Sequence, residues 1–410
     1  MQFFALDQVL PHDHVARVIW EFVEGLDLTG FYDQIKAREG RPGRDPADPR
    51  VLVTLWLLAT TEGVGSARKL AKLCERDLAY MWVCGGVGVN YHMLSDFRTE
   101  HVELLDRLLT DSVASLLHQG LISLDRVAQD GMRVRAHAGG SSFRRRTTLE
   151  KHREEARQLV EALREEQEAD SGAADRRTAA ARERAARERT ERIEKALEEL
   201  DQLEEKAEHR KKGSSVKCRA STTDPEARRM KMGDGGFRPA YNIQYATTGD
   251  SRVIVGVDVT NSGSDGGQMT PMTEQIHERY QTHPGAQIVD GGFVVLDDIE
   301  AVEASGTKVY APVKDEEKKR ASGVDPFAPL PSDSEGVAAW RQRMGTEEAK
   351  TLYSERASTA EFPNAVCRNR NLHQFLVRGL RKVRAVALWH ALAYNLTRIT
   401  ALRTAAAAPT

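Results

Sequence analysis

The chain has 410 residues, and its 59 lysines and arginines against 61 aspartates and glutamates leave a formal net charge of −2. This length suffices for two or three domains with buried cores, while the balanced total conceals strong local segregation of charge. No run of about 18 apolar residues predicts a membrane span, and the first residues lack the basic-then-apolar start of a signal peptide. Four scattered cysteines without a CxxC pair exclude a zinc or disulfide framework. We therefore expect a cytoplasmic protein with reduced thiols and no membrane partner.

Residues 1 to about 120 have the apolar spacing of short helices throughout. The spacing predicts helices at residues 15–23, 49–59, 66–74 and 93–101. Ser66 would cap one of them, and Ser95 or Asp96 another. Short helices joined by glycine-containing turns suit a DNA-binding domain of the helix-turn-helix kind. The pattern fits a helical bundle without a ligand equally well.

The composition changes abruptly at residues 147–212. Glutamate, arginine, lysine and alanine dominate two stretches, 149–168 and 173–210, which Asp170-Ser171-Gly172 separates. Near-heptad spacing in the second stretch predicts an antiparallel pair of long helices, on the residues Ile193, Leu197, Leu200, Leu203 and Ala207. Strand-like sequence stops before this segment and resumes after it, so we interpret it as an insertion. Its mixed charges are typical of a solvated face, and contact with DNA or a partner is the less favoured alternative.

Strand-like segments flank this insertion. Strands are predicted at 127–134, 241–247, 252–259, 286–290 and 307–313. Helices are predicted at 272–280 and 294–305, and a basic, glycine-containing connector at 213–240. The polar residues 314–345 predict a mobile excursion, after which the pattern is helical to the end.

Two of these strands each deliver an aspartate followed by glycine, at Asp130-Gly131 and at Asp290-Gly291-Gly292. Glycine lets a chain leave a strand sharply, so we expect each carboxylate to be presented at a sheet end. Two carboxylates on neighbouring strand ends suit a divalent metal, because hard cations prefer oxygen ligands. The alternative is that each aspartate only hydrogen-bonds a turn. The metal hypothesis still requires a third ligand.

From Phe362 to Thr410 the chain contains no aspartate or glutamate. Its basic residues there are Arg368, Arg370, Arg378, Arg381, Lys382, Arg384, Arg398 and Arg403. An acid-free basic block suits contact with a polyanion, and the alternative is an ordinary solvated helix face. His390 lies on the apolar stripe of the same helices, so we interpret it as a core histidine rather than a ligand.

Without the insertion, the predicted order is three strands, helix, strand, helix, strand and a final helical region. This order fits a ribonuclease-H-like fold, an α/β fold whose mixed sheet has antiparallel strands first and parallel strands after. In such folds the acidic residues come from the first strand, the end of the fourth strand and the last helix. We therefore predict this mixed sheet with a helical-hairpin insertion, preceded by an all-α N-terminal domain.

Several motifs, in this order, resemble one known family. Asp130-Gly131 and Asp290-Gly291-Gly292-Phe293 match its two catalytic aspartate motifs. Its Tyr-Arg-Glu signature, with a basic residue seven positions on, is matched by Tyr353, Arg356, Glu361 and Arg368. Residues 10–17, 26–28, 48–52 and 96–98 resemble the N-terminal helical domain of this family. Residues 230–242 resemble its connector. The chain thus resembles, over nearly its whole length, the DDE transposases of bacterial insertion sequences that have an InsH-like N-terminal domain.

The resemblance implies a division of the chain into an all-α DNA-binding InsH-like domain, a ribonuclease-H-like DDE catalytic domain, an inserted coiled-coil hairpin and a flexible tail. Their respective residues are 1–120, 121–146 with 213–400, 147–212 and 401–410. It implies that Asp130, Asp290 and Glu361 are the catalytic residues and hold two Mg²⁺ ions, for which Mn²⁺ can substitute. Together with the basic block, it implies DNA contacts from Tyr353, Arg356, Arg368, Arg378, Arg381 and Arg384.

The implied function is that of an insertion-sequence transposase. Such an enzyme binds the terminal inverted repeats of its element, cleaves DNA at its ends and transfers the strands into target DNA, here as a homodimer in the DNA complex. Two alternatives remain open: a catalytically inactive or domesticated DNA-binding protein, and a metal-dependent nuclease without strand transfer.

One departure from the family pattern follows Glu361. Phe362-Pro363 stands where unbroken helix is expected, and proline removes a donor and clashes with the preceding turn. We expect either a helix that starts near Pro363 or a kink beside the site. Glu355, between Tyr353 and Arg356, is expected to point away from both on a helix.

Overall fold

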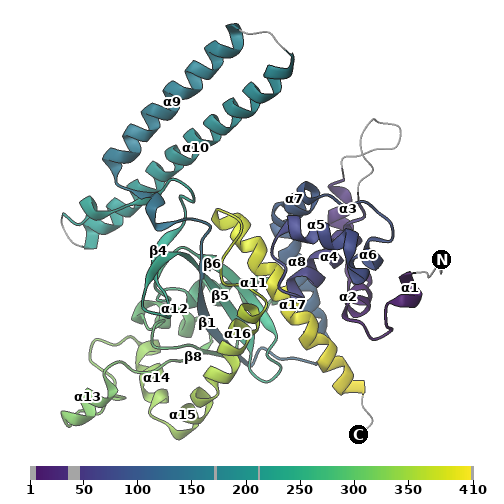
Figure 1. Ribbon diagram of the computed structural model, residues 1–410. Coiled ribbons are helices and arrows are strands. Elements are labelled where there is room, and N and C mark those ends of the chain that lie inside the picture. Colours follow the sequence, from purple (N-terminus) through teal and green to yellow (C-terminus); the bar gives the residue numbers. More distant parts are fainter. Residues whose placement is uncertain (1–5, 36–46, 170–172, 211–212, 408–410) are drawn as a thin grey trace.

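The computed structural model describes residues 6–35, 47–169, 173–210 and 213–407 (Figure 1). It shows a helical N-terminal region, a curled mixed sheet with helices, and an arm of two long helices that projects away from both. The prediction of an all-α region followed by an α/β region is confirmed at this level. None of the described helices is long and apolar enough to cross a membrane.

The described N-terminal helices are mostly short. They are α1 (Leu6–Val9), α2 (Val15–Glu24), α3 (Thr29–Asp33), α4 (Pro49–Thr61), α5 (Ala67–Arg76), α6 (Leu78–Cys84), α7 (Tyr91–Glu100) and α8 (Val102–His118). Side chains cap α2, α4, α5, α6 and α7 at their N-termini. Ser66 caps α5 as predicted, since its hydroxyl accepts from the backbone N–H of Lys69. The predicted cap of α7 is wrong, because this helix starts earlier: Asn90 caps it, and Ser95 and Asp96 lie inside.

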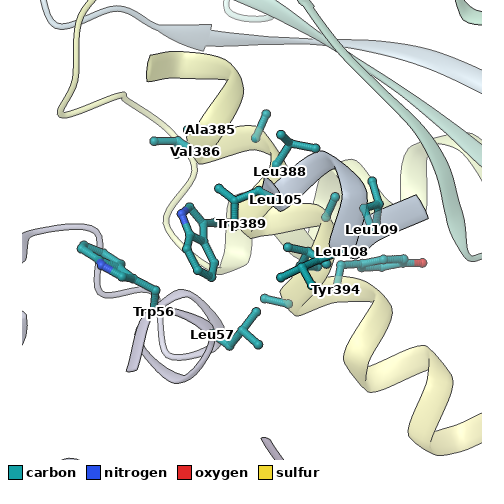
Figure 2. Close-up of a cluster of buried hydrophobic side chains, with 14 of the residues drawn as sticks. Trp56, Leu57, Leu105, Leu108, Leu109, Ala385, Val386, Leu388, Trp389 and Tyr394 are labelled. Atoms are coloured by element: carbon teal, nitrogen blue, oxygen red, sulfur yellow. The ribbon is translucent and has the colours of Figure 1, made fainter. Parts of the chain in front are cut away.

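One apolar core joins these helices to the C-terminal helix α17 (Leu380–Ala407). Figure 2 shows Trp389 of α17 between Trp56 of α4 and Leu105 of α8. The indole N–H of Trp389 donates to the carbonyl of Arg98 at 3.1 Å. Because α17 packs against β6 (Ile254–Thr260) of the sheet as well, this helix anchors the N-terminal region to the sheet.

Helix α17 also tests two sequence predictions. His390 is buried in it, as predicted for a core histidine, and burial lowers the pKa of its imidazole to about 3. The predicted flexible tail is wrong for residues 401–407, which continue α17, because alanine-rich sequence favours helix. The rest of that tail, residues 408–410, lies outside the described residues.

The main sheet has antiparallel strands on one side and parallel strands on the other. Its strands are β1 (Arg126–Arg135), β4 (Arg228–Lys231), β5 (Phe237–Thr248), β6, β7 (Ala286–Ile288) and β8 (Lys308–Tyr310). Strand β1 pairs antiparallel with β5 and parallel with β7, and β7 pairs parallel with β8. Strands β4 and β6 share the other edge of β5. Helices α11 (Met269–Tyr280) and α12 (Leu296–Ala304) connect β6, β7 and β8.

Three buried glutamines hold the central strands in register. Gln129 of β1 donates to Gln244 of β5 at 3.0 Å and accepts from Gln287 of β7 at 2.6 Å. A slip by one residue would leave these buried amides unsatisfied, which costs about 1–3 kcal/mol for each group. The register that these amides select also sets which residues of β1 and β7 lie side by side.

The arm consists of α9 (Arg146–Ala169) and α10 (Ala173–Arg210), as predicted. At its base, Leu197 and Leu200 pack with Leu149 of α9. Two short strands, β2 (Phe143–Arg144) and β3 (Ala220–Ser221), pair beneath it. The predicted connector therefore contains β3, β4 and the start of β5 rather than irregular chain. The predicted helix break at 170–172 lies outside the described residues.

Residues 314–345 are not the mobile excursion that their polarity predicts. They carry α13 (Glu316–Ala321) and α14 (Glu335–Met344). Trp340 of α14 is buried and donates its indole N–H to the carbonyl of Ala311 at 3.1 Å. One large apolar anchor thus overrides the surrounding polar sequence. Helices α15 (Glu347–Ser354) and α16 (Phe362–Asn369) follow, with a π-helical turn at Ala357–Glu361 between them.

Candidate active site

The pairing of β1 with β7 brings Asp130 and Asp290 together. Ala128 of β1 lies opposite Ile288 of β7 in the parallel ladder. Each aspartate comes two residues later, Asp130 within β1 and Asp290 just past the end of β7, so both lie beyond the last paired residues at the same end of two neighbouring strands. Burial first, and the nearby charge of Asp290 second, raise the pKa of the Asp130 carboxyl to about 6. The sheet thus holds two carboxylates close enough to repel each other.

The two Asp-Gly motifs serve different purposes. Beyond Asp290 the chain turns, and the backbone N–H of Gly292 donates to the Asp290 carboxylate at 2.7 Å. The predicted sharp exit is wrong for Gly131, because β1 continues to Arg135. A Cβ on Gly131 would overlap the carboxylate of Asp265 and lie 2.7 Å from Nε2 of Gln244. Glycine at 131 therefore provides space and not a change of direction.

Glu361, the predicted third carboxylate, lies at the end of the π-helical turn. Its side chain is 58% exposed, and it accepts a hydrogen bond from the guanidinium of Arg356 at 3.2 Å. Burial raises the pKa of both Asp130 and Tyr353. The positive charge of Arg356 acts in the opposite direction on both groups. Arg356 thus lies within electrostatic reach of both halves of the predicted site.

These three carboxylates do not form one cluster. Within the residues that the structure describes, no three histidine, cysteine, aspartate or glutamate side chains are grouped so that they could hold a metal ion. Glu355, the neighbouring acid, pairs with Arg126 at 3.2 Å. In the structure Asp130 and Asp290 thus lie close together, whereas Glu361 forms an ion pair with Arg356.

The π-helical turn explains the departure at Pro363. Helix α16 begins at Phe362, so Pro363 lies in its first turn, where a missing N–H interrupts no helical bond. The structure combines the two expectations: α16 begins at Phe362, but it continues the π-helical turn without a break, so the helix is irregular beside the site. A π turn accommodates one residue more than an α turn, and such turns are frequent at functional sites.

Asn364 completes the surroundings of Asp130. Its Nδ2 donates to Oδ2 of Asp130 at 2.8 Å. Its buried Oδ1 has no hydrogen-bond partner among the described residues. Two carboxylates and an unpartnered amide oxygen are hard ligands of the kind that Mg²⁺ accepts. These residues therefore fit a divalent cation, which would also offset the repulsion between the two aspartates.

Asp265, which was not predicted from the sequence, also lies against this site. Asn242 and Gln244 donate to its Oδ1 at 2.6 and 2.8 Å. A Cβ on Gly292 would lie 2.9 Å from Asp290 Oδ1 and 3.7 Å from Asp265 Oδ2, so the two carboxylates approach the same point. The signal was in the sequence, since Asp265-Gly266-Gly267 repeats the pattern of Asp290-Gly291-Gly292.

The arginines of the basic block that are predicted to contact DNA differ in the protein groups that they contact. Arg381 forms an ion pair with Glu103 at 2.7 Å, and Arg384 lies 3.6 Å from Asp106. Arg378 donates to the backbone carbonyl of His137 at 3.4 Å, and its charge partly offsets the rise that burial causes in the pKa of the Asp224 carboxyl. Arg368 is exposed on α16. Contact of any of these arginines with DNA stays a prediction.

Two family models match the chain. Residues 4–100 match the model described as Transposase domain (DUF772), and residues 209–396 match the Transposase DDE domain. Asp290, Arg356 and Glu361 lie within the second match, and Asp130 lies between the two. No curated protein and no solved structure matches the chain.

Proposed function

Since the chain belongs to the DDE transposases of insertion sequences, we propose that it binds the terminal inverted repeats of its element, cleaves the DNA there and joins the ends to target DNA. Membership implies DNA as a partner and a metal-dependent DNA-processing enzyme, because DDE transposases generally use divalent metal ions. The observation that carries the proposal is the pair of Asp130 and Asp290, held side by side by β1 and β7 next to Asn364.

The catalytic region is proposed to have a ribonuclease-H-like fold. The sheet order supports this: β6, β5, β1, β7 and β8 are neighbours in that sequence, with the first three antiparallel and the last three parallel. In this arrangement Asp130 comes from the first strand and Asp290 from the end of the fourth predicted strand, as the fold requires of its acidic residues.

Asp130, Asp290 and Glu361 would hold the metal, which we propose to be two Mg²⁺ ions that Mn²⁺ can replace. When bound, the ions would activate the attacking water or 3′-hydroxyl and stabilise the leaving oxygen. Asn364 holds one oxygen of Asp130 and so orients the other. Tyr353 and Arg356 would position the phosphate that is cut.

Glu361 must leave Arg356 to reach the aspartates. An exposed ion pair contributes about 0–1 kcal/mol, so a DNA phosphate that takes over the guanidinium would release this carboxylate at little cost. DNA binding would thereby complete the ligand set. The helical region of residues 1–120 would contact the element ends, and the active complex would be a homodimer on DNA.

A cleavage and joining assay tests this function. Duplexes that contain the DNA on both sides of the reading frame would be incubated with the protein and Mg²⁺, with Asp290→Asn as the control. We expect nicks at the boundaries of imperfect inverted repeats, joined products, and neither with the control. Cleavage without joining would favour the nuclease alternative. Binding without cleavage would favour an inactive DNA-binding protein.

A further inference from the structure

A cavity of about 950 Å³ lies at the base of the arm. Helix α10, strand β4 and the loop after β6 line it, together with the chain that connects the arm to the sheet. Its basic lining residues are Arg145, Lys206, Lys217, Arg219, Arg228 and Arg229, and its lining includes no carboxylate. In a chain whose charges nearly cancel, this is a strongly segregated positive surface.

Most of this charge is not neutralised by the protein itself. Arg228 pairs with Glu199 of α10, but the other five basic residues form no ion pair with any residue in the described ranges. They are all exposed. Leu203 and Ala207, which are half-buried, continue the apolar stripe of α10 past its buried part and line this cavity. The chain that connects the arm to the sheet, with Lys206 of α10 and Arg229 of β4, therefore presents a basic wall to solvent.

The cavity shares a wall with the candidate active site. Its loop, Asn261 to Ser264, leads directly to Asp265. Arg133, three residues after Asp130 on β1, donates to the carbonyls of Gly263 at 3.0 Å and Lys231 at 3.2 Å. The same guanidinium lies 3.6 Å from Asp265. A polyanion bound with one end at the aspartates would thus extend from them into the cavity.

We propose that this basic cavity binds the backbone of the DNA duplex that leads away from the cleavage site, so that the base of the arm is a second DNA-contact surface. This inference rests on the proposed function, because it takes DNA as the substrate of the neighbouring carboxylates. A small anion is bound by donors that converge on one point. The cations of this open surface are separate from one another, so the surface is better matched to a backbone of regularly spaced phosphates.

The test is the salt dependence of binding to a 40-base-pair duplex of arbitrary sequence, measured by fluorescence anisotropy without metal. The variant is Lys217→Gln/Arg219→Gln/Arg229→Gln. The matched control is Arg182→Gln/Arg184→Gln/Arg189→Gln, which removes the same charge from exposed positions on α10 that line no part of the cavity. Each lost phosphate contact lowers the slope of log affinity against log salt by about 0.9. We expect the slope of the cavity variant to fall by about 2 to 3 and that of the control to stay at the wild-type value.

The outcomes separate this inference from the function on which it rests. If the wild-type protein binds no duplex, the proposed function is contradicted, and this inference with it. If the wild type binds and both triple variants have its slope, the cavity does not contact DNA. Loss of self-association by the cavity variant alone, measured by light scattering, would assign the cavity to an acidic protein surface and overturn the proposal. Equal melting temperatures of the three proteins establish that none of these results comes from misfolding.

Discussion

Asp130 and Asp290 directly follow the paired residues of β1 and β7, whereas Glu361 contacts Arg356 at the helical edge. Strand pairing places the two aspartates with or without a ligand. The position of Glu361 depends on a π-helical turn and on a partner that DNA can replace. The sheet thus supplies a prearranged pair, and the helical edge supplies a group whose place depends on the substrate.

The energies behind this difference are unequal. A slip of β1, which carries Asp130, would break the hydrogen bonds among the buried amides of Gln129, Gln244 and Gln287. Moving Glu361 requires the loss of an exposed ion pair, worth about 0–1 kcal/mol. Substitutions in the sheet should therefore have large effects on cleavage, and substitutions of exposed arginines small ones.

The largest effect is expected from Asp130→Ala or Asp290→Ala. Either change removes one of the two paired carboxylates, so Mg²⁺-dependent cleavage should fall to background, while DNA binding and the fold persist. Strand nicking and circular dichroism would measure the two aspects. Nicking at the wild-type rate by either variant would contradict the assignment of these aspartates as metal ligands.

Gly131→Ala comes next. The new methyl group would overlap the Asp265 carboxylate and force β1 or the loop of Asp265 to move. Displacement of a catalytic group by about 1 Å can cost about 10²-fold in rate, which is the expected loss of cleavage. Gly140→Ala is the matched control, because no atom lies within 4 Å of its added methyl group. Equal activity of the two variants would show that the site accommodates a methyl group at position 131 without displacing Asp130 or Asp265.

The raised pKa of Asp130 predicts a smaller effect, on stability. Since its folded pKa of about 6 exceeds the unfolded value, this group's stabilising contribution is complete below the unfolded pKa and is lost as pH rises through about 6. In a chelator at pH 7.5, Asp130→Asn should therefore raise the free energy of unfolding by about 1–3 kcal/mol. The gain should shrink towards pH 4. Urea titrations at both pH values measure it, and a gain independent of pH would contradict the raised pKa.

The smallest effects concern the arginines of the basic block. Arg381 has a carboxylate partner in Glu103, whereas Arg378 donates to the carbonyl of His137 and forms no ion pair with any described residue. Arg378→Gln should therefore reduce the salt dependence of DNA binding by up to about 0.9 in slope, and Arg381→Gln by less. The opposite ranking would mean that DNA displaces Glu103.

Local pattern predicted much of this molecule and failed where distant contacts decide. Alternating apolar residues and Asp-Gly motifs indicated the strands that carry Asp130 and Asp290. The anchoring of the polar segment by Trp340 was missed, because one isolated tryptophan leaves no periodic signal. The partners of Arg381 and Arg384 come from α8, far away in the chain, so an acid-free segment could not predict them.

The candidate site was predictable to the same degree. Two aspartates on neighbouring strands follow from strand order, and Asn364 and Asp265 do not, because each acts through the tertiary contacts that it makes. The one-residue register change of a π turn has no sequence signal of the same strength, so the direction of Glu361 required the structure.

The most direct test of the account is Mg²⁺-dependent cleavage of an end-containing duplex by Glu361→Gln and Glu355→Gln, assayed side by side. Both variants lose one carboxylate that pairs with an arginine at 3.2 Å, so they match in charge and in the contact removed. Glu361→Gln should abolish cleavage and strand transfer, while Glu355→Gln stays near the wild-type rate. An inactive Glu355→Gln with an active Glu361→Gln would contradict the assignment of the third ligand.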